Sequence, residues 1–213
     1  MTLFITFEGG EGSGKSVQAR TLHRRLTRRT IPALLTQEPG GTALGQQLAN
    51  LLKWARDTGI SPLTESLMFN ASRVQLMTEV IRPNLQAGNL VICDRYTDST
   101  IAYQGYGRRL DLEVVKMINS TTTRKLIPNL TILLDIPPEE GFDRVKSRNI
   151  QKDRFENENI AFHRRIREGY LKMAASEPER WLVVDARQPK AKIAQIIWQR
   201  VSRLLSTQGT GSG

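Results

Sequence analysis

The sequence predicts an α/β fold in which helices cover both faces of a parallel sheet, and three observations support this. Strand-like and helix-like hydrophobic segments alternate along the chain. The first strand-like segment, residues 3–7, runs directly into a glycine-rich loop that is followed by a helical pattern. No linker rich in proline or glycine divides the 213 residues. We therefore expect a single domain over residues 1–205 and a disordered tail over 206–213, which ends in glycine and serine.

The individual elements follow from composition and periodicity. Short apolar segments rich in β-branched and aromatic residues predict strands at 3–7, 33–36, 90–93, 130–134 and 181–184. Apolar residues at helical spacing predict helices after residue 16 and over 44–54, 112–118, 138–148, 162–173 and 193–204. A further helix begins with Ser61 as its cap and Pro62 in its first turn, and we expect it to end near Pro83.

The glycine-rich loop fits the pattern G-x-x-x-x-G-K-[ST] from Gly9 to Ser16 without a mismatch. Phosphate oxygens accept hydrogen bonds, and glycine permits the backbone turns that aim N–H groups at them. The following helix adds the positive end of its dipole, Lys15 reaches the terminal phosphates, and Ser16 offers a hydroxyl to Mg²⁺. We expect the nucleotide to be bound by Gly9, Gly10, Glu11, Gly12, Ser13, Gly14, Lys15, Ser16 and Val17.

Composition narrows the class of protein. Cys93 is the only cysteine, which excludes a disulfide framework and a cysteine-based metal site. No apolar stretch has transmembrane length and the N-terminus has no signal-peptide pattern, so we expect a cytoplasmic protein. The net charge is +10. Part of this charge forms one helical face, which we interpret as solvated because no nucleic-acid-binding motif accompanies it: Arg20, Arg24, Arg25, Arg28 and Arg29.

Several polar motifs follow the predicted strands. They are Glu8 onward, residues 38–42 (EPGGT), residues 94–96 (DRY) and Asp185. In an open parallel sheet, ligands bind beyond the carboxyl ends of the strands. We therefore expect one crevice to gather these motifs.

In their order along the chain, the motifs resemble those of the thymidylate kinase family, over essentially all residues before the tail. The loop is followed by residues 38–42 (EPGGT), 67–73 (LMFNASR), 94–96 (DRY), 99–105 (STIAYQG) and 153–156 (DRFE). The resemblance implies transfer of the γ-phosphoryl of ATP to dTMP, giving dTDP and ADP, with Mg²⁺ as cofactor. It also implies a P-loop fold like that of nucleoside monophosphate kinases, with a five-stranded parallel sheet and a short lid. A homodimer is implied as well, with no nucleic acid or membrane as partner.

The resemblance also implies catalytic roles. Lys15 would bridge the β- and γ-phosphates, and Arg95 would grip the acceptor phosphate. Ser16 would hold Mg²⁺, and Asp94 would orient Arg95 or hold a metal-bound water. Residues 11–14 carry no arginine, whereas the lid, about residues 144–156, is strongly basic. The sequence therefore resembles the bacterial type of the family, which supplies its catalytic arginine from the lid. Arg148 and Arg154 are the first candidates, followed by Arg144.

A pocket for the acceptor nucleotide is implied in the same way. Phe69 would stack on thymine, and Arg73, which lies on the same helical face, would bond a base carbonyl. Ser99 and Gln104 would face the base edge, and Tyr103 would pack near the deoxyribose. The implied substrate-binding set is Glu11, Phe69, Arg73, Arg95, Ser99, Tyr103 and Gln104, with Glu11 nearest the sugar 3′-hydroxyl.

Some positions depart from the pattern or leave alternatives open. Gln37 stands where many relatives carry arginine, and we interpret His23 and His163 as surface residues. Another P-loop kinase, acting on a nucleoside or a different monophosphate, is one alternative function. A P-loop ATPase that nucleic acid stimulates through the basic helical face is the other.

Overall fold

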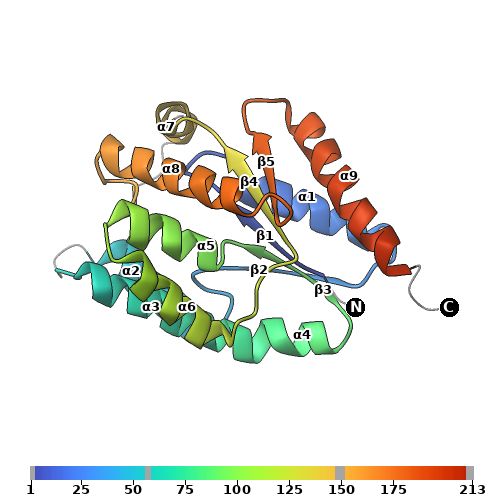
Figure 1. Ribbon diagram of the computed structural model, residues 1–213, viewed down its shortest axis with the longest axis horizontal. Helices are drawn as coiled ribbons and strands as arrows, with labels where there is room; N and C mark the ends of the chain where they lie inside the picture. Colours follow the sequence, from blue (N-terminus) through green and yellow to red (C-terminus); the bar gives the residue numbers. More distant parts are fainter. Residues whose placement is uncertain (1–2, 56–58, 147–151, 210–213) are drawn as a thin grey trace.

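The chain folds around a five-stranded parallel sheet with helices on both sides, as the sequence predicts (Figure 1). The computed structural model describes residues 3–55, 59–146 and 152–209. The strand order is β2-β3-β1-β4-β5, which places the first strand at the centre. The strands are β1 (Phe4–Glu8), β2 (Ala33–Gln37), β3 (Leu90–Asp94), β4 (Leu130–Asp135) and β5 (Trp181–Asp185).

Two helices, α1 (Lys15–Thr27) and α9 (Lys190–Gly209), pack on each other and cover one face of the sheet. The other long helices lie on the opposite side (Figure 1). These are α2 (Ala43–Trp54), α3 (Pro62–Leu76), α6 (Leu112–Thr123) and α8 (Ile160–Ser176). The shorter segments are α4 (Arg82–Gln86), α5 (Thr97–Thr100), α7 (Pro138–Lys146) and the π-helical η1 (Met77–Ile81) and η2 (Ile101–Gly107).

The central strand contributes to the core on both faces of the sheet. Ile5 and Phe7 pack in the cluster that α1 and α9 complete, whereas Phe4 packs in the cluster that contains Tyr96 and η1. All three β1 residues are fully or almost fully buried. A parallel sheet that is covered on both faces requires such continuous apolar runs, which is why these strands could be recognised from the sequence.

The helix that begins at Pro62 is longer than predicted. Ser61 caps it and accepts a hydrogen bond from the Thr64 backbone N–H, as expected. We expected it to end near Pro83, and η1 and α4 continue its path through Pro83 to Gln86. The wider π-helical turn interrupts the regular hydrogen-bond ladder, and Pro83 then takes an early position of α4, where its missing N–H costs little.

The C-terminal helix extends beyond its expected boundary, and part of the predicted lid lies outside the described residues. Helix α9 runs to Gly209 and thus includes the first part of the segment that we expected to be a tail. Residues 210–213 lie outside the described residues. In the predicted lid, α7 ends at Lys146 and the chain is described again from residue 152. Arg148 therefore lies outside the described residues.

The basic face of α1 takes part in packing between helices. The guanidinium groups of Arg25 and Arg29 lie 4.4 and 4.8 Å from the centre of the Trp198 ring on α9. Arginine binds aromatic faces through its charge and its flat shape. This contact gives part of the face a structural role. In the described part of the chain, no helix is long and apolar enough to cross a membrane.

The register of the sheet brings the strand ends to one edge. Phe7 pairs with Asp94, Glu8 pairs with Leu133, and Asp135 pairs with Asp185. Because all the strands are parallel, their carboxyl ends meet there, and the glycine-rich loop and the DRY motif leave the sheet side by side.

Candidate active site

The glycine-rich loop wraps around Lys15 at the start of α1. Gly14, which precedes the helix, has a φ of 89°, a backbone conformation that residues with a side chain rarely adopt. Lys15 Nζ donates a hydrogen bond of 2.8 Å to the Gly10 carbonyl and lies 3.4 Å from Ser13 Oγ. Burial lowers the pKa of Lys15 to about 8, and the nearby positive charge of Arg95 adds to this effect. The loop therefore holds a buried ammonium group whose hydrogen-bond partners are a carbonyl and a hydroxyl of the same loop.

Ser16 and Asp94, the two residues expected at the metal ion, lie together. The Ser16 hydroxyl donates a hydrogen bond to Asp94 Oδ2. A hydroxyl and a carboxylate are hard oxygen ligands of the kind that Mg²⁺ prefers, and Mg²⁺ in nucleotide sites takes its remaining ligands from phosphates and water. No group of three or more His, Cys, Asp or Glu side chains suited to a metal ion occurs among the described residues. The pair thus fits an ion that arrives with a nucleotide.

Arg95 occupies the centre of the site in a strained backbone conformation. Its φ is 74°, in the left-handed region that non-glycine residues seldom adopt. The guanidinium donates to Glu11 Oε1 at 2.8 Å and to the Tyr103 hydroxyl at 3.0 Å. Burial alone would lower the pKa of Arg95, but Tyr103, Glu11 and the other acidic groups around it raise the pKa well above its usual range. The strained turn therefore holds a permanent cation against the phosphate loop.

Two acidic side chains flank this cation and have opposite pKa shifts. Burial raises the pKa of Glu8 to about 7, and the charge of Asp98 adds to the increase. Glu8 accepts hydrogen bonds from Ser99 Oγ at 2.6 Å and from the Tyr170 hydroxyl at 2.8 Å. Burial would raise the pKa of Glu11 as well, but Arg95 and Lys15 outweigh it and lower the pKa to about 2. Glu11 is therefore the carboxylate that stays charged.

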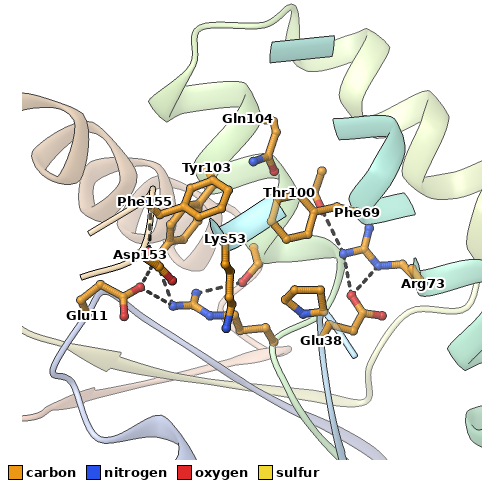
Figure 2. Close-up of a pocket in the computed structure, with 13 residues that line it drawn as sticks. Glu11, Glu38, Lys53, Phe69, Arg73, Thr100, Tyr103, Gln104, Asp153 and Phe155 are labelled. Atoms are coloured by element: carbon orange, nitrogen blue, oxygen red, sulfur yellow. Dashed lines mark hydrogen bonds and ion pairs between the residues drawn. The ribbon is translucent and has the colours of Figure 1, made fainter. Parts of the chain in front are cut away.

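A pocket opens beside Arg95, and all seven residues of the implied substrate-binding set line it (Figure 2). Phe69 lies on one wall and faces Phe155, with ring centres 5.6 Å apart, and Tyr103 lies 6.1 Å from Phe155. Glu11 and Arg95 belong to both the pocket and the surroundings of the phosphate loop. The pocket lining is Glu11, Glu38, Pro39, Lys53, Phe69, Arg73, Arg95, Ser99, Thr100, Tyr103, Gln104, Asp153 and Phe155.

Arg73 is more buried, and forms more bonds within the protein, than its implied contact with the base suggests. It is 1% exposed and forms an ion pair of 2.7 Å with Glu38. Its donors also reach Asn70, Asn119, the Tyr96 carbonyl and Thr100. With this set of acceptors, every guanidinium N–H already has a partner. A base carbonyl could bond Arg73 only by sharing or replacing one of these acceptors.

The lid arginines lie in different places. Arg154 Nε donates to the Leu52 carbonyl at 2.9 Å, and its Nη2 forms an ion pair of 2.7 Å with Glu65. These two bonds go to α2 and α3 and not to the phosphate loop. Arg144 donates to the Ala186 carbonyl beyond β5. Arg148, the other first candidate, lies outside the described residues.

Some features of the site have no counterpart in the sequence analysis. His163 is only 4% exposed and packs edge-on against Phe142 and Phe162, so the surface prediction for it is wrong. The basic residues around His163 on α8 suggested a solvated face. In the structure, however, His163 is buried together with its neighbour Phe162. The hydroxyl of Tyr170, a residue within the helix predicted over 162–173, donates a hydrogen bond to Glu8.

A contact between two glycines joins the phosphate loop to α7. A Cβ at Gly12 would lie 2.0 Å from the Gly141 carbonyl oxygen, and a Cβ at Gly141 would lie 2.2 Å from the Glu11 carbonyl oxygen. Contacts this short do not occur, so neither position can carry a side chain without a backbone shift. The helix that leads into the lid thus rests directly on the phosphate loop.

The chain is similar to known proteins over almost its whole length. A model of the thymidylate kinase family matches residues 7–197. A thymidylate kinase from Dehalococcoides mccartyi is 51% identical over 205 residues, which cover 96% of this chain and 98% of that protein. One from Desulfovibrio desulfuricans is 44% identical over 215 residues, with 98% and 99% covered. The crystal structure of a thymidylate kinase from Ehrlichia chaffeensis superposes with a TM-score of 0.76 at 31% identity, covering 94% and 98% of the two chains.

The glycine contact predicts the effect of one methyl group. Gly141→Ala should weaken ATP binding about tenfold, because the new Cβ forces the loop backbone away from its present position. Titration calorimetry with a non-hydrolysable ATP analogue measures this. Gly59→Ala, where a Cβ meets nothing within 4 Å, is the matched control. Unchanged affinity in Gly141→Ala would show that the loop adjusts freely.

The raised pKa of Glu8, about 7, predicts a pH dependence of stability. Folding favours the protonated carboxyl, so the free energy of unfolding should fall as pH rises from about 5 through 7 and then level off. Glu8→Gln should remove this decline, so its stability relative to wild type should increase by about 1–3 kcal/mol between pH 5 and 8. Urea unfolding at a series of pH values measures it. Glu177→Gln, at a carboxyl whose pKa is lowered, should show no such trend in this range.

Proposed function

Because the chain belongs to the thymidylate kinase family and phosphorylates dTMP to dTDP with ATP, we propose that the pocket beside Arg95 binds dTMP and that the loop from Gly9 to Val17 binds the phosphates of ATP. One observation carries this assignment: the seven residues implied for the acceptor line one pocket that shares Arg95 and Glu11 with the phosphate loop. Two anionic substrates need such a shared cation between them. Phosphoryl transfer depends mainly on positioning and charge stabilisation, which these residues can supply.

We propose that each part of dTMP meets a different group. Arg95 would bind the 5′-phosphate through its planar guanidinium, exchanging weak contacts such as the 3.3 Å bond to the Gly9 carbonyl for phosphate oxygens. Thymine would stack on Phe69, and Phe155, whose ring centre lies 5.6 Å from that of Phe69, would border the stacked base. The Tyr103 hydroxyl and Glu11, which share a 2.8 Å hydrogen bond, would border the sugar.

We propose that Mg²⁺ is held by Ser16 and Asp94 when ATP is bound. The two oxygens are hydrogen-bonded to each other, and Ser16 directly follows Lys15, beside which the β- and γ-phosphates would lie. The ion would neutralise charge on the transferring group. Lys15 would bind phosphate oxygens beside the carbonyl and hydroxyl oxygens that it contacts in the loop.

We propose further that the catalytic arginine comes from the lid, as in the bacterial type. Residues 9–14 contain no arginine, and the glycine contact brings α7 against this loop. Arg148 and Arg154 are both proposed to serve. Arg154 would have to exchange its bonds to Glu65 and Leu52 for a phosphate contact, which favours Arg148 for the larger share.

We propose a homodimer that forms through α2, α3 and α6. These helices pack side by side, α2 on α3 and α3 on α6. Together they carry most of the exposed large apolar side chains among the described residues, and apolar surfaces of this kind mark interfaces. The exposed residues are Leu44, Leu51, Trp54, Leu63, Leu67, Val74, Val114 and Met117.

A coupled assay of ADP release tests the acceptor assignment. With ATP and Mg²⁺, ADP should form with dTMP but not with thymidine or without an acceptor. Thymidine has no 5′-phosphate to bind Arg95 or to accept the γ-phosphoryl, so it should be a poor substrate even at high concentration. ADP formation that needs no acceptor and increases with DNA would contradict the assignment and favour the nucleic-acid-stimulated ATPase.

Replacing the stacking side chain separates the two substrates. Phe69→Ala should raise the KM for dTMP about tenfold or more, since stacking of a base on an aromatic ring contributes about 1–3 kcal/mol. The KM for ATP should stay within about twofold, because the phosphate loop is untouched. Steady-state kinetics with each substrate varied in turn measures both values. An equal rise in both would place Phe69 outside the base site.

A further inference from the structure

Glu65 is a buried carboxylate to which the sequence analysis assigns no role. It lies in the first turns of α3 and is 0% exposed. A carboxylate taken out of water needs strong partners, and removing them from a buried charge is costly. Glu65 has such partners, and they come from separate parts of the chain.

The partners of Glu65 use both of its oxygens. Oε1 accepts from Gln104 Nε2 at 2.8 Å and from Arg108 Nε at 3.1 Å. Oε2 accepts from Arg108 Nη2 at 3.1 Å and pairs with Arg154 Nη2 at 2.7 Å. Three hydrogen bonds and one ion pair thus occupy both carboxylate oxygens. With two guanidinium groups beside it, the group is an acceptor only.

An acceptor-only partner determines which end of the Gln104 amide can face it. The NH₂ group must turn toward Glu65, because the amide oxygen would meet another acceptor. The oxygen Oε1 is then the end left for the pocket, which Gln104 lines and where Oε1 has no hydrogen-bond partner among the described residues. Figure 2 shows Gln104 on the pocket wall near Tyr103 and Phe69.

Arg154 and Arg108 connect Glu65 to the lid side of the pocket. Arg154 lies 4.7 Å from the centre of the Phe155 ring, and its backbone N–H bonds the Lys53 carbonyl. Arg108 also pairs with Glu158 and lies 4.7 Å from the Phe162 ring. Burial alone would lower the pKa of Arg108, but the bonds to Glu65 and Glu158 outweigh it and raise the pKa. The carboxylate thus fixes Phe155 against the same pocket whose edge Gln104 forms.

We propose that Glu65 is a positioning residue that sets base specificity: by holding the NH₂ of Gln104, it presents an amide oxygen that accepts an imide N–H and repels a ring nitrogen with a lone pair. A thymine or uracil base has the N–H at this edge, whereas cytosine has the lone pair. An unmatched acceptor pair in a buried site discriminates strongly. This inference rests on the proposed function, specifically on contact between Gln104 and the base.

The test compares dissociation constants for dTMP and dCMP, measured by calorimetry on the intact protein. Glu65→Gln should reduce the preference for dTMP about tenfold or more, because a glutamine can also donate and lets the Gln104 amide turn over. Glu65→Asp keeps an acceptor-only group and should keep the preference while both nucleotides bind more weakly. Asp98→Asn, at another buried carboxylate paired with an arginine, is the control and should leave the preference unchanged.

Two further measurements keep the outcomes distinct. If Gln104→Ala lowers the preference but Glu65→Gln leaves it within about twofold of wild type, Glu65 does not set the amide and the inference is overturned. If neither variant changes the preference, Gln104 does not contact the base and the proposed site itself is wrong. Should Glu65→Gln fail to fold, the side-chain amide signal of Gln104 in wild-type protein decides. Slow exchange of its protons with water supports the bond to Glu65, and exchange at the rate of free glutamine refutes it.

Discussion

The site depends on one partly buried positive charge, the guanidinium of Arg95. Removing a guanidinium from water is costly unless every donor finds an acceptor, and the acceptors here come from distant parts of the chain. Glu11 comes from the phosphate loop, Tyr103 from η2 and Tyr170 from α8. Satisfying this charge therefore draws three segments to one point. The left-handed backbone at Arg95 is tolerated because these bonds hold the side chain where that turn places it.

The sequence was sufficient for those features that depend on local pattern. Strand positions could be read because each strand is apolar on both faces, and the phosphate loop could be read because glycine and lysine occur at fixed spacing. The motif around Arg95 and the aromatic position Phe69 came from resemblance to a family, and the structure brings them into one pocket. Their contacts with substrate remain predictions.

What could not be predicted depends on distant partners. Helical spacing marks Tyr170 as a core residue, but nothing near it in sequence shows that its hydroxyl meets Glu8. Glu65 looks like an ordinary acidic residue in a first helical turn, because its partners lie 39 or more positions away. The path of the chain through Pro83 was missed because π-helical turns leave no clear periodic signal. A buried His163 was missed because its charged neighbours dominate the local pattern.

The contact between Gly12 and Gly141 makes the phosphate loop and α7 one mechanical unit. No side chain or water fits between the two backbones, so neither can fluctuate far without displacing the other. A nucleotide that stiffens the loop also restrains the helix, and a helix that frays loosens the loop. Nucleotide bound in the loop should therefore slow local unfolding of α7 and so slow its amide hydrogen exchange. This helix itself carries no residue of the phosphate-binding motif.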